Sequence, residues 1–336
     1  MNNFKKFLIQ YGFNNTDADK IINTYSFDTF FEDTLINHSK QVIELLDIMG
    51  YNKSSIIKIV KSFPQILGLG LNNIRNKIKY LKTIGLSDND INLIIKRFPA
   101  IFAYNIRSMN KRIKFLIKLG YEYNEILKIV KICPNIFGFK TEKIEEIIKT
   151  FQRLGYNNNQ IIKLTSASPA ILAYSTNNIT NKVLFLNNLG YSKEDVIKTT
   201  TTFPALFSYS QEKISKKFTD LIELGYSRED ILIMTKKLPS IYGLDIYNIK
   251  QKMDFYNDLK IKIDFVKYPM LLIQSLELGK ARYSFYKDKG IKIDSNNYSK
   301  LFIRQQQFKD IYNIDNKTLM FLYNEEEDNN GKRIKV

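Results

Sequence analysis

The chain has 336 residues and carries 51 Lys and Arg against 34 Asp and Glu, a formal net charge of +17. A single cysteine, Cys133, excludes a disulfide framework and a cysteine-cluster metal site, and a single histidine, His38, leaves no material for a multi-histidine metal centre or a Ser-His-Asp triad. Apolar residues make up 44 % of the chain, enough for a buried core, and the positive charge favours a polyanionic partner such as nucleic acid.

The first residues do not read as a targeting or membrane segment. They lack a long apolar run and a small-residue cleavage site, so we expect no secretory signal. No stretch of about 18 uncharged apolar residues occurs anywhere, and we expect no transmembrane helix and no membrane partner. Residues 7–13 mimic the end of the repeat unit described next, and Ser26 stands where a unit would have proline. Residues 1–39 therefore predict a degenerate N-terminal cap.

From Gly50 onward the sequence repeats every 35 residues. Six of the seven prolines follow a glycine by 14 residues, and the last proline comes 30 residues after the sixth. The glycines are Gly50, Gly85, Gly120, Gly155, Gly190 and Gly225, and the prolines are Pro64, Pro99, Pro134, Pro169, Pro204, Pro239 and Pro269. A fixed period of this length is typical of helical repeat proteins.

Each unit predicts two long helices joined by a short turn. Glycine ends one helix in the left-handed conformation, and a polar cap two residues later begins the next. The first helix ends at proline, and the Pro-x-Ile-Leu/Phe segment that follows is short enough for one 3₁₀ turn. The second helix has apolar residues at i, i+4, i+7 and i+10. Capping boxes are predicted for the pairs Ser87 and Asp90, Asn157 and Gln160, Ser192 and Asp195, and Ser227 and Asp230.

The predicted fold is all-α, an α-solenoid or superhelix of about 35-residue repeats with two long helices and a short proline-led 3₁₀ turn in each repeat. One unit cannot close its own core, so neighbouring units must stack to bury their apolar faces. We expect the repeat solenoid over residues 40–315, with a closing segment from about residue 269. The acidic, Asn-rich stretch 325–330, followed by basic residues, predicts that residues 316–336 form a C-terminal tail that is partly disordered.

Two positions of the unit are mostly basic, and in a solenoid such positions form stripes. One lies 13 residues after each of the first six prolines, where Ile147 is the exception, and the other lies three residues before each of them, where Ser166 and Thr201 are the exceptions. Together with Arg97 and Arg282 they predict a phosphate-contacting track. Its members are Lys61, Lys77, Lys96, Arg97, Arg112, Lys131, Lys182, Lys217, Lys236, Lys252 and Arg282.

The alternative for any one of these side chains is that it only solvates an outer helix face. For Arg282 a second alternative is that it anchors a neighbouring helix. On the track hypothesis, replacing four of these residues, which lie next to the apolar stripe of the second helix, by alanine weakens binding without unfolding the chain. The residues of that test are Lys77, Arg112, Lys182 and Lys217.

Other notable residues favour structural roles. Tyr104, Tyr174 and Tyr209 share a position that other units fill with Leu or Phe, which indicates core packing. Cys133 shares a position with Phe, Leu and Ser, so a buried thiol is predicted. No phosphate loop, HExxH or nucleophile elbow is present, and we expect neither an enzyme nor a cofactor or metal site.

The unit resembles that of the mitochondrial transcription termination factor (mTERF) family over roughly residues 40–315. Residues 99–121 carry it through the Pro-x-Ile-Phe turn and the Arg-Ile-Lys-Phe-Leu and Leu-Gly-Tyr segments. The closing segment is similar in Tyr268–Leu272, Ser275–Glu277, Arg282, Gly290, Phe308 and Tyr312, with Tyr286 at a position that is usually Leu. The resemblance implies a superhelical solenoid with a positively charged groove for double-stranded DNA or structured RNA, without catalytic residues.

The leading expectation is a monomeric, non-enzymatic protein that binds double-stranded DNA in transcription regulation or termination. One alternative is an RNA-binding or ribosome-assembly factor of the same fold, and another is a protein-binding scaffold. The opening of each unit is also similar to the first helix of TAL-effector-type DNA-binding repeats, although those turn on a loop without Pro-x-Ile-Leu. The expected location is a mitochondrial or plastid matrix in a eukaryote and the cytoplasm in a bacterium, and not outside the cell.

Overall fold

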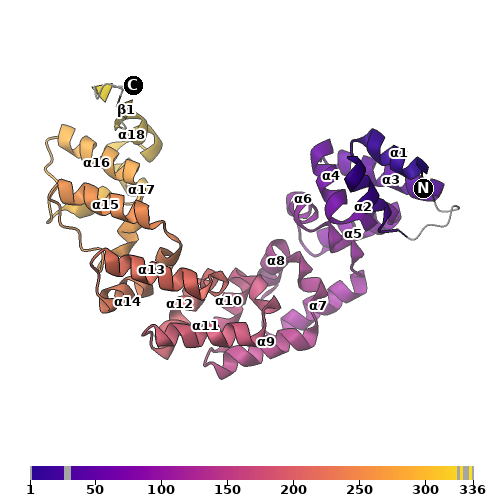
Figure 1. The fold of residues 1–336 in the computed structure, drawn as a ribbon, viewed down its shortest axis with the longest axis horizontal. Helices are drawn as coiled ribbons and strands as arrows, with labels where there is room; N and C mark the ends of the chain where they lie inside the picture. Colours follow the sequence, from indigo (N-terminus) through magenta and orange to yellow (C-terminus); the bar gives the residue numbers. More distant parts are fainter. Residues whose placement is uncertain (1, 26–31, 324–325, 328–332, 335–336) are drawn as a thin grey trace. The chain divides into compact units, whose positions relative to one another are not determined.

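The computed structural model describes residues 2–25, 32–323, 326–327 and 333–334, and most of these residues lie in helices (Figure 1). The expected all-α repeat architecture is confirmed. The chain divides into two compact units, Met1–Ile179 and Thr180–Val336, and each is described by itself.

The first unit begins with three helices and continues with the repeats. Its elements are α1 (Asn2–Tyr11), α2 (Asn15–Ile22), α3 (Glu32–Ile48), α4 (Lys53–Ser62), η2 (Pro64–Gly68), α5 (Leu71–Thr83), α6 (Asp88–Arg97), η3 (Pro99–Ala103), α7 (Ile106–Lys118), α8 (Tyr123–Ile132), η4 (Pro134–Gly138), α9 (Thr141–Arg153), α10 (Asn158–Ala167) and η5 (Pro169–Ala173). The unit boundary falls inside α11 (Thr176–Asn188).

The second unit continues the same order of elements and ends in a closing segment. It contains α12 (Lys193–Thr202), η6 (Pro204–Ser208), α13 (Gln211–Glu223), α14 (Arg228–Lys237), η7 (Pro239–Gly243), α15 (Ile246–Asp258), η8 (Pro269–Leu272), α16 (Leu276–Asp288), η9 (Tyr298–Phe302), α17 (Gln305–Tyr312), α18 (Asn316–Tyr323), β1 (Glu326–Glu327) and β2 (Arg333–Ile334). The two short strands pair antiparallel, with Glu326 opposite Ile334.

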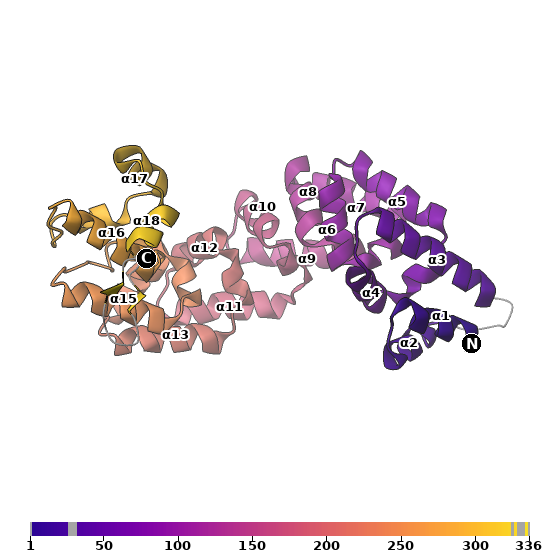
Figure 2. The same ribbon diagram turned by 90° about the horizontal axis from the view of Figure 1, so that it is seen from above.

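Each regular repeat has a 10-residue helix, a five-residue 3₁₀ helix led by proline, and a 13-residue helix, as the sequence predicts. Gly120 closes α7 with a φ of 94°, a conformation that side chains with a Cβ rarely adopt. The first helices of successive repeats, α4, α6 and α8, pack in a row within the first unit (Figure 2). Ile101 and Phe102 of the 3₁₀ helix are fully buried, so the turn itself belongs to the core.

Three of the four predicted capping boxes are confirmed, at Ser87, Asn157 and Ser227. In the fourth, the hydroxyl of Ser192 accepts the backbone N–H of Asp195, but the Asp195 carboxylate does not complete the box; it lies 3.2 Å from the amine of Lys236. A further box between Glu122 and Glu125 escaped the sequence analysis because glutamate is an unusual first member.

The two ends of the chain differ from a regular repeat. Ser26, expected at a proline position, lies outside the described residues. Helix α3 runs across the expected boundary between residues 39 and 40, and α18 packs on α16 with Leu319 fully buried. The tail expected from residue 316 thus begins with a packed helix, and its expected disorder falls mostly on residues outside the described part. The domain boundaries themselves stay a prediction.

Candidate nucleic-acid interface

Four of the five basic residues that lie 13 positions after the first six prolines are buried. They stand on the second helix of each repeat, between apolar residues of the same face, as Lys77 stands between Ile74 and Leu81. The exposed fraction of Lys77 and Lys182 is 6 %, and that of Arg112 and Lys217 is 8 %. Burial lowers the pKa of each of these side chains because the charged form loses its hydration.

These buried cations contact the next repeat. All of them except Lys217 donate hydrogen bonds to carbonyl oxygens at the end of the following 3₁₀ helix, where the last carbonyl groups have no partner within that helix. Lys77 donates to Phe102 O, Arg112 to Phe139 O and to Thr141 Oγ1, Lys182 to Tyr209 O, and Lys252, which is less buried, to Leu272 O at 2.6 Å. We call Lys77, Arg112, Lys182, Lys217, Lys252 and Arg282 the inter-repeat cations.

Two repeats vary this arrangement. In the third repeat the position holds the buried Ile147, and Lys143, one turn earlier on α9, donates to Ala173 O at 2.7 Å. In the fifth, the Lys217 amine lies 3.9 Å from the Asp220 carboxylate, beside the end of η7 and the beginning of α15. A cation at the repeat junction is thus retained even where the residue or its partner changes.

Arg282 is the most deeply buried of the inter-repeat cations, with 1 % of its surface exposed. Its guanidinium donates to Leu301 O at 2.9 Å and Ile303 O at 2.7 Å, and also to Asn316 Oδ1 at 3.0 Å. The guanidinium carbon lies 4.8 Å from the centre of the Phe308 ring. Arg282 therefore joins α16 to η9, α17 and α18, which is the anchoring alternative considered above.

The basic residues three positions before proline form ion pairs with aspartates of the preceding first helices. Lys61 pairs with Asp17 at 2.8 Å, Lys131 with Asp90 at 2.9 Å and Lys236 with Asp195 at 3.2 Å. The bond from Lys131 lowers the pKa of the Asp90 carboxyl. Lys96 is the exception because Ser55 stands where its aspartate would be, and both Lys96 and Arg97 are exposed.

Within the described part of the chain, nine of the eleven predicted residues therefore have a backbone or carboxylate partner of their own. Lys96 and Arg97 have no ion pair there and are free to meet a ligand. Contact between nucleic acid and these eleven residues stays a prediction. The predicted track is not one continuous set of exposed side chains, because most members hold adjacent repeats together.

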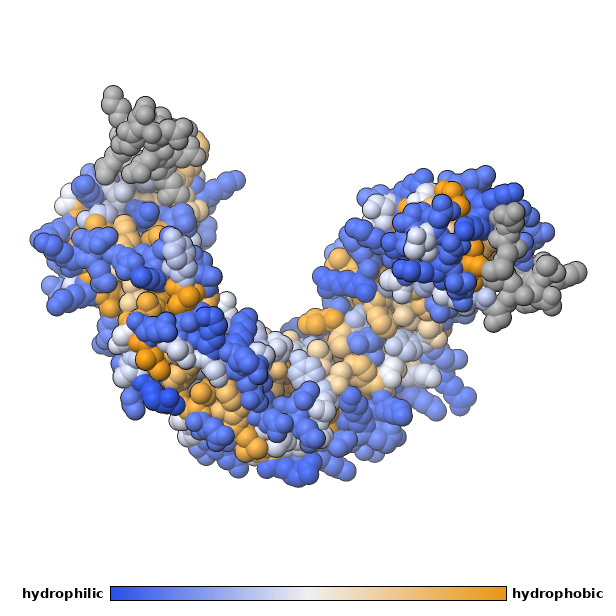
Figure 3. Space-filling view, viewed as in Figure 1, coloured by the Kyte–Doolittle hydropathy of each residue, from blue (hydrophilic) through white to orange (hydrophobic). Residues whose placement is uncertain are grey.

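Exposed cations outside the two positions are concentrated in one part of the first unit. Residues 51–120 contain 14 Lys and Arg, ten of them exposed and outside the two positions, but only two acidic residues, Asp88 and Asp90, so they carry +12 of the net charge of +17. Hydrophilic side chains cover much of the visible face of each unit, with apolar residues between them (Figure 3). Sequence reasoning overlooked this concentration because it searched for positions that recur in every repeat, whereas a running charge count along the chain shows it.

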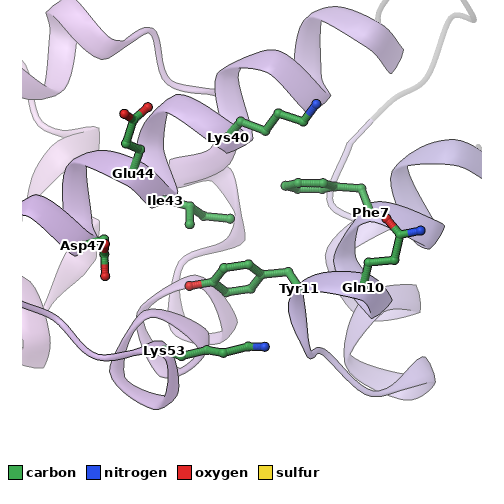
Figure 4. Close-up of a pocket in the computed structure, with 8 residues that line it drawn as sticks. All are labelled: Phe7, Gln10, Tyr11, Lys40, Ile43, Glu44, Asp47 and Lys53. Atoms are coloured by element: carbon green, nitrogen blue, oxygen red, sulfur yellow. The ribbon is translucent and has the colours of Figure 1, made fainter.

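A pocket lies at the N-terminal end of the first unit, among α1, α3 and α4, and has a volume of about 530 Å³. Figure 4 shows the ring of Tyr11 close to Lys53, whose amine is 5.3 Å from the ring centre. Two lysines and two carboxylates give the wall mixed charge, without a nucleophile paired to a base. It is lined by Phe7, Gln10, Tyr11, Lys40, Ile43, Glu44, Asp47 and Lys53.

The described residues contain no cluster of three or more His, Cys, Asp or Glu side chains that could hold a metal ion. Cys133 is 7 % exposed, and burial raises the pKa of its thiol to about 11, which is unfavourable for a nucleophile. Among the helices that the structure describes, none has the length and apolar character needed to cross a membrane.

Comparison with known proteins agrees with the repeat geometry. The sequence model of the mTERF family matches residues 1–129 and residues 118–309, two overlapping regions that cover nearly the whole chain. No curated protein sequence matches the chain.

Proposed function

Because the chain belongs to the mTERF family, whose helical repeats bind nucleic acids, we propose that it acts on double-stranded DNA, in transcription regulation or termination. The proposed protein is a non-enzymatic monomer. Its proposed location is the matrix of an organelle, where proteins of this family are often found.

The concentration of positive charge in residues 51–120 is the observation that supports this proposal most strongly. A polyanion is the partner that such a surface fits, and a duplex presents a dense, regular row of phosphates. Lys96 and Arg97 at the end of α6 belong to this region and are exposed. Phosphate contacts would give affinity and register, while arginine is the better side chain for reading guanine in a groove.

A salt titration with competitors tests the proposal. A labelled DNA duplex of about 30 base pairs is bound by the full chain, and we expect the affinity to fall on the order of 10³-fold between about 50 and 200 mM salt if six phosphates are contacted. Unlabelled duplex DNA should compete better than duplex RNA or single strands. The measurement is fluorescence anisotropy.

Two other outcomes would replace this proposal. Stronger competition by duplex or structured RNA would assign the protein to RNA binding or ribosome assembly on the same fold. Duplex binding no tighter than that of a simple polycation of equal charge would favour a protein-binding scaffold and contradict the proposal.

A further inference from the structure

We propose that the exposed face of α7 is the principal phosphate-binding surface of the first unit, and that its ligand is the backbone of duplex nucleic acid. This inference rests on the proposed function and names the site within it. Four cations carry the surface, and we call them the α7 stripe: Arg107, Lys111, Lys114 and Lys118.

The α7 stripe runs the length of one helix face. Its residues are spaced i, i+4, i+7 and i+11, and at about 100° per residue these positions stack along one side of an α-helix. All four side chains are exposed, and none forms an ion pair within the described part of the chain. The helix contains no acidic residue. Among the described residues, the stripe is therefore a row of charges that no ion pair neutralises.

The same face is not basic in the other repeats. The equivalent residues are Asn72, Asn76, Lys79 and Thr83 on α5; Glu142, Glu146, Lys149 and Arg153 on α9; Asn177, Asn181, Leu184 and Asn188 on α11; Glu212, Lys216, Thr219 and Glu223 on α13; and Tyr247, Gln251, Asp254 and Asp258 on α15. None of these faces has more than two cations, and three of them include carboxylates. If these cations only solvated helix surfaces, we would expect similar numbers of them on the equivalent faces of the other repeats, and not four on α7 alone.

The stripe is unfavourable for the free protein. Arg107 and Lys111 repel each other at i, i+4, as do Lys114 and Lys118, and Arg107 also lies at the positive end of the helix dipole. A bound row of phosphates would relieve this repulsion. A surface that weakens its own helix and suits an anion is typical of a binding site rather than of a structural feature.

The helix is held firmly enough to present these charges in a fixed geometry. Its opposite face buries Met109, Arg112, Ile113 and Leu116. The amide of Asn110 accepts a hydrogen bond from the Tyr80 hydroxyl at 3.0 Å, and Arg112 bonds to the following repeat. The stripe extends over about 16 Å, the axial rise of roughly five nucleotides of one strand.

The test replaces the stripe with neutral side chains in the full protein: Arg107→Gln, Lys111→Gln, Lys114→Gln and Lys118→Gln together. A matched control neutralises three lysines and one arginine that are exposed in the second unit: Lys193→Gln, Lys198→Gln, Lys287→Gln and Arg304→Gln. Both variants have the same net charge. Binding to a duplex of about 30 base pairs is measured by anisotropy across the same salt range.

For the stripe variant we expect the slope of log affinity against log salt to become shallower by about 3 to 4, and affinity at about 100 mM salt to fall on the order of 10²-fold. The control slope should change by less than about 1. The stripe variant should melt at or above the wild-type temperature because like-charge repulsion is removed. If the fourfold variant melts below the wild-type temperature, duplex binding is measured instead on the double variant Lys111→Gln and Lys114→Gln. Its salt slope should then change by half as much.

If the stripe variant and the control lose duplex affinity equally, the inference is overturned while the proposed function stays intact. Unchanged duplex binding together with lost binding to poly-glutamate would also overturn it and assign the stripe to an acidic protein. Absence of duplex binding by the wild-type protein would instead refute the proposed function itself.

Discussion

The substitution Arg282→Ala is expected to lower the free energy of unfolding of the C-terminal unit by about 3–5 kcal/mol. It removes the side-chain donor of Ile303 O and one of the two side-chain donors of Leu301 O, the other being Gln274 Nε2 at 3.0 Å, and it removes the guanidinium packed on Phe308. The closing segment would lose its contact with α16. Urea unfolding followed by circular dichroism measures the change.

Two controls separate this role from simple loss of charge. Arg282→Lys keeps the charge but cannot reach three acceptors with a planar fork, so we expect an intermediate loss. Lys287→Ala on the same helix removes an exposed charge and should change stability by less than about 0.5 kcal/mol. Wild-type stability of Arg282→Ala would show that the anchoring account of this residue is wrong.

Arg112→Ala is expected to destabilise the first unit by about 2–4 kcal/mol, since it leaves Phe139 O and Thr141 Oγ1 without their donor at a repeat junction. This differs from the expectation drawn from the sequence, in which the same substitution weakens nucleic-acid binding and leaves the fold intact. Thermal and urea unfolding of the full chain give the loss, with duplex affinity measured on the folded fraction.

The neighbouring residue provides the matched control. Lys111→Ala on the same helix should leave stability within about 0.5 kcal/mol of the wild type but weaken duplex binding. The opposite pattern, with Arg112→Ala fully stable and Lys111→Ala without effect on binding, would contradict the division between buried and exposed cations.

The helices and turns could be predicted from the sequence because their causes are local. Glycine and proline at a 35-residue period determine where each helix ends, and the spacing of apolar residues assigns the helix faces. The position of Asp195 shows where local reasoning stops. Its spacing from Ser192 predicts a capping box, but the carboxylate of Asp195 does not complete the box, whereas Asp90, which also pairs with a lysine of the next repeat, does.

The roles of the basic residues could not be read from their recurrence alone. A cation that recurs in every repeat can contact either a ligand or the next repeat. Only the packed structure shows that carbonyl oxygens at the end of the following 3₁₀ helix accept hydrogen bonds from these cations. One signal was present in the sequence. Lys77 lies three residues after Ile74 and four before Leu81, which places it on the buried face of the helix. The α7 stripe was visible as a helical spacing in a single repeat.

Chemical labelling of lysine amines, with and without duplex DNA, tests the central claim most directly. The claim is that buried cations join the repeats while exposed ones bind phosphate. We predict slow labelling of Lys77, Lys182 and Lys217 in both conditions, although burial lowers the pKa of their amines and would speed the reaction if reagent could reach them. Lys111, Lys114 and Lys118 should label quickly and become protected by DNA. Fast labelling of Lys77 and its equivalents in the free protein, with protection by DNA there and none on α7, would contradict the claim.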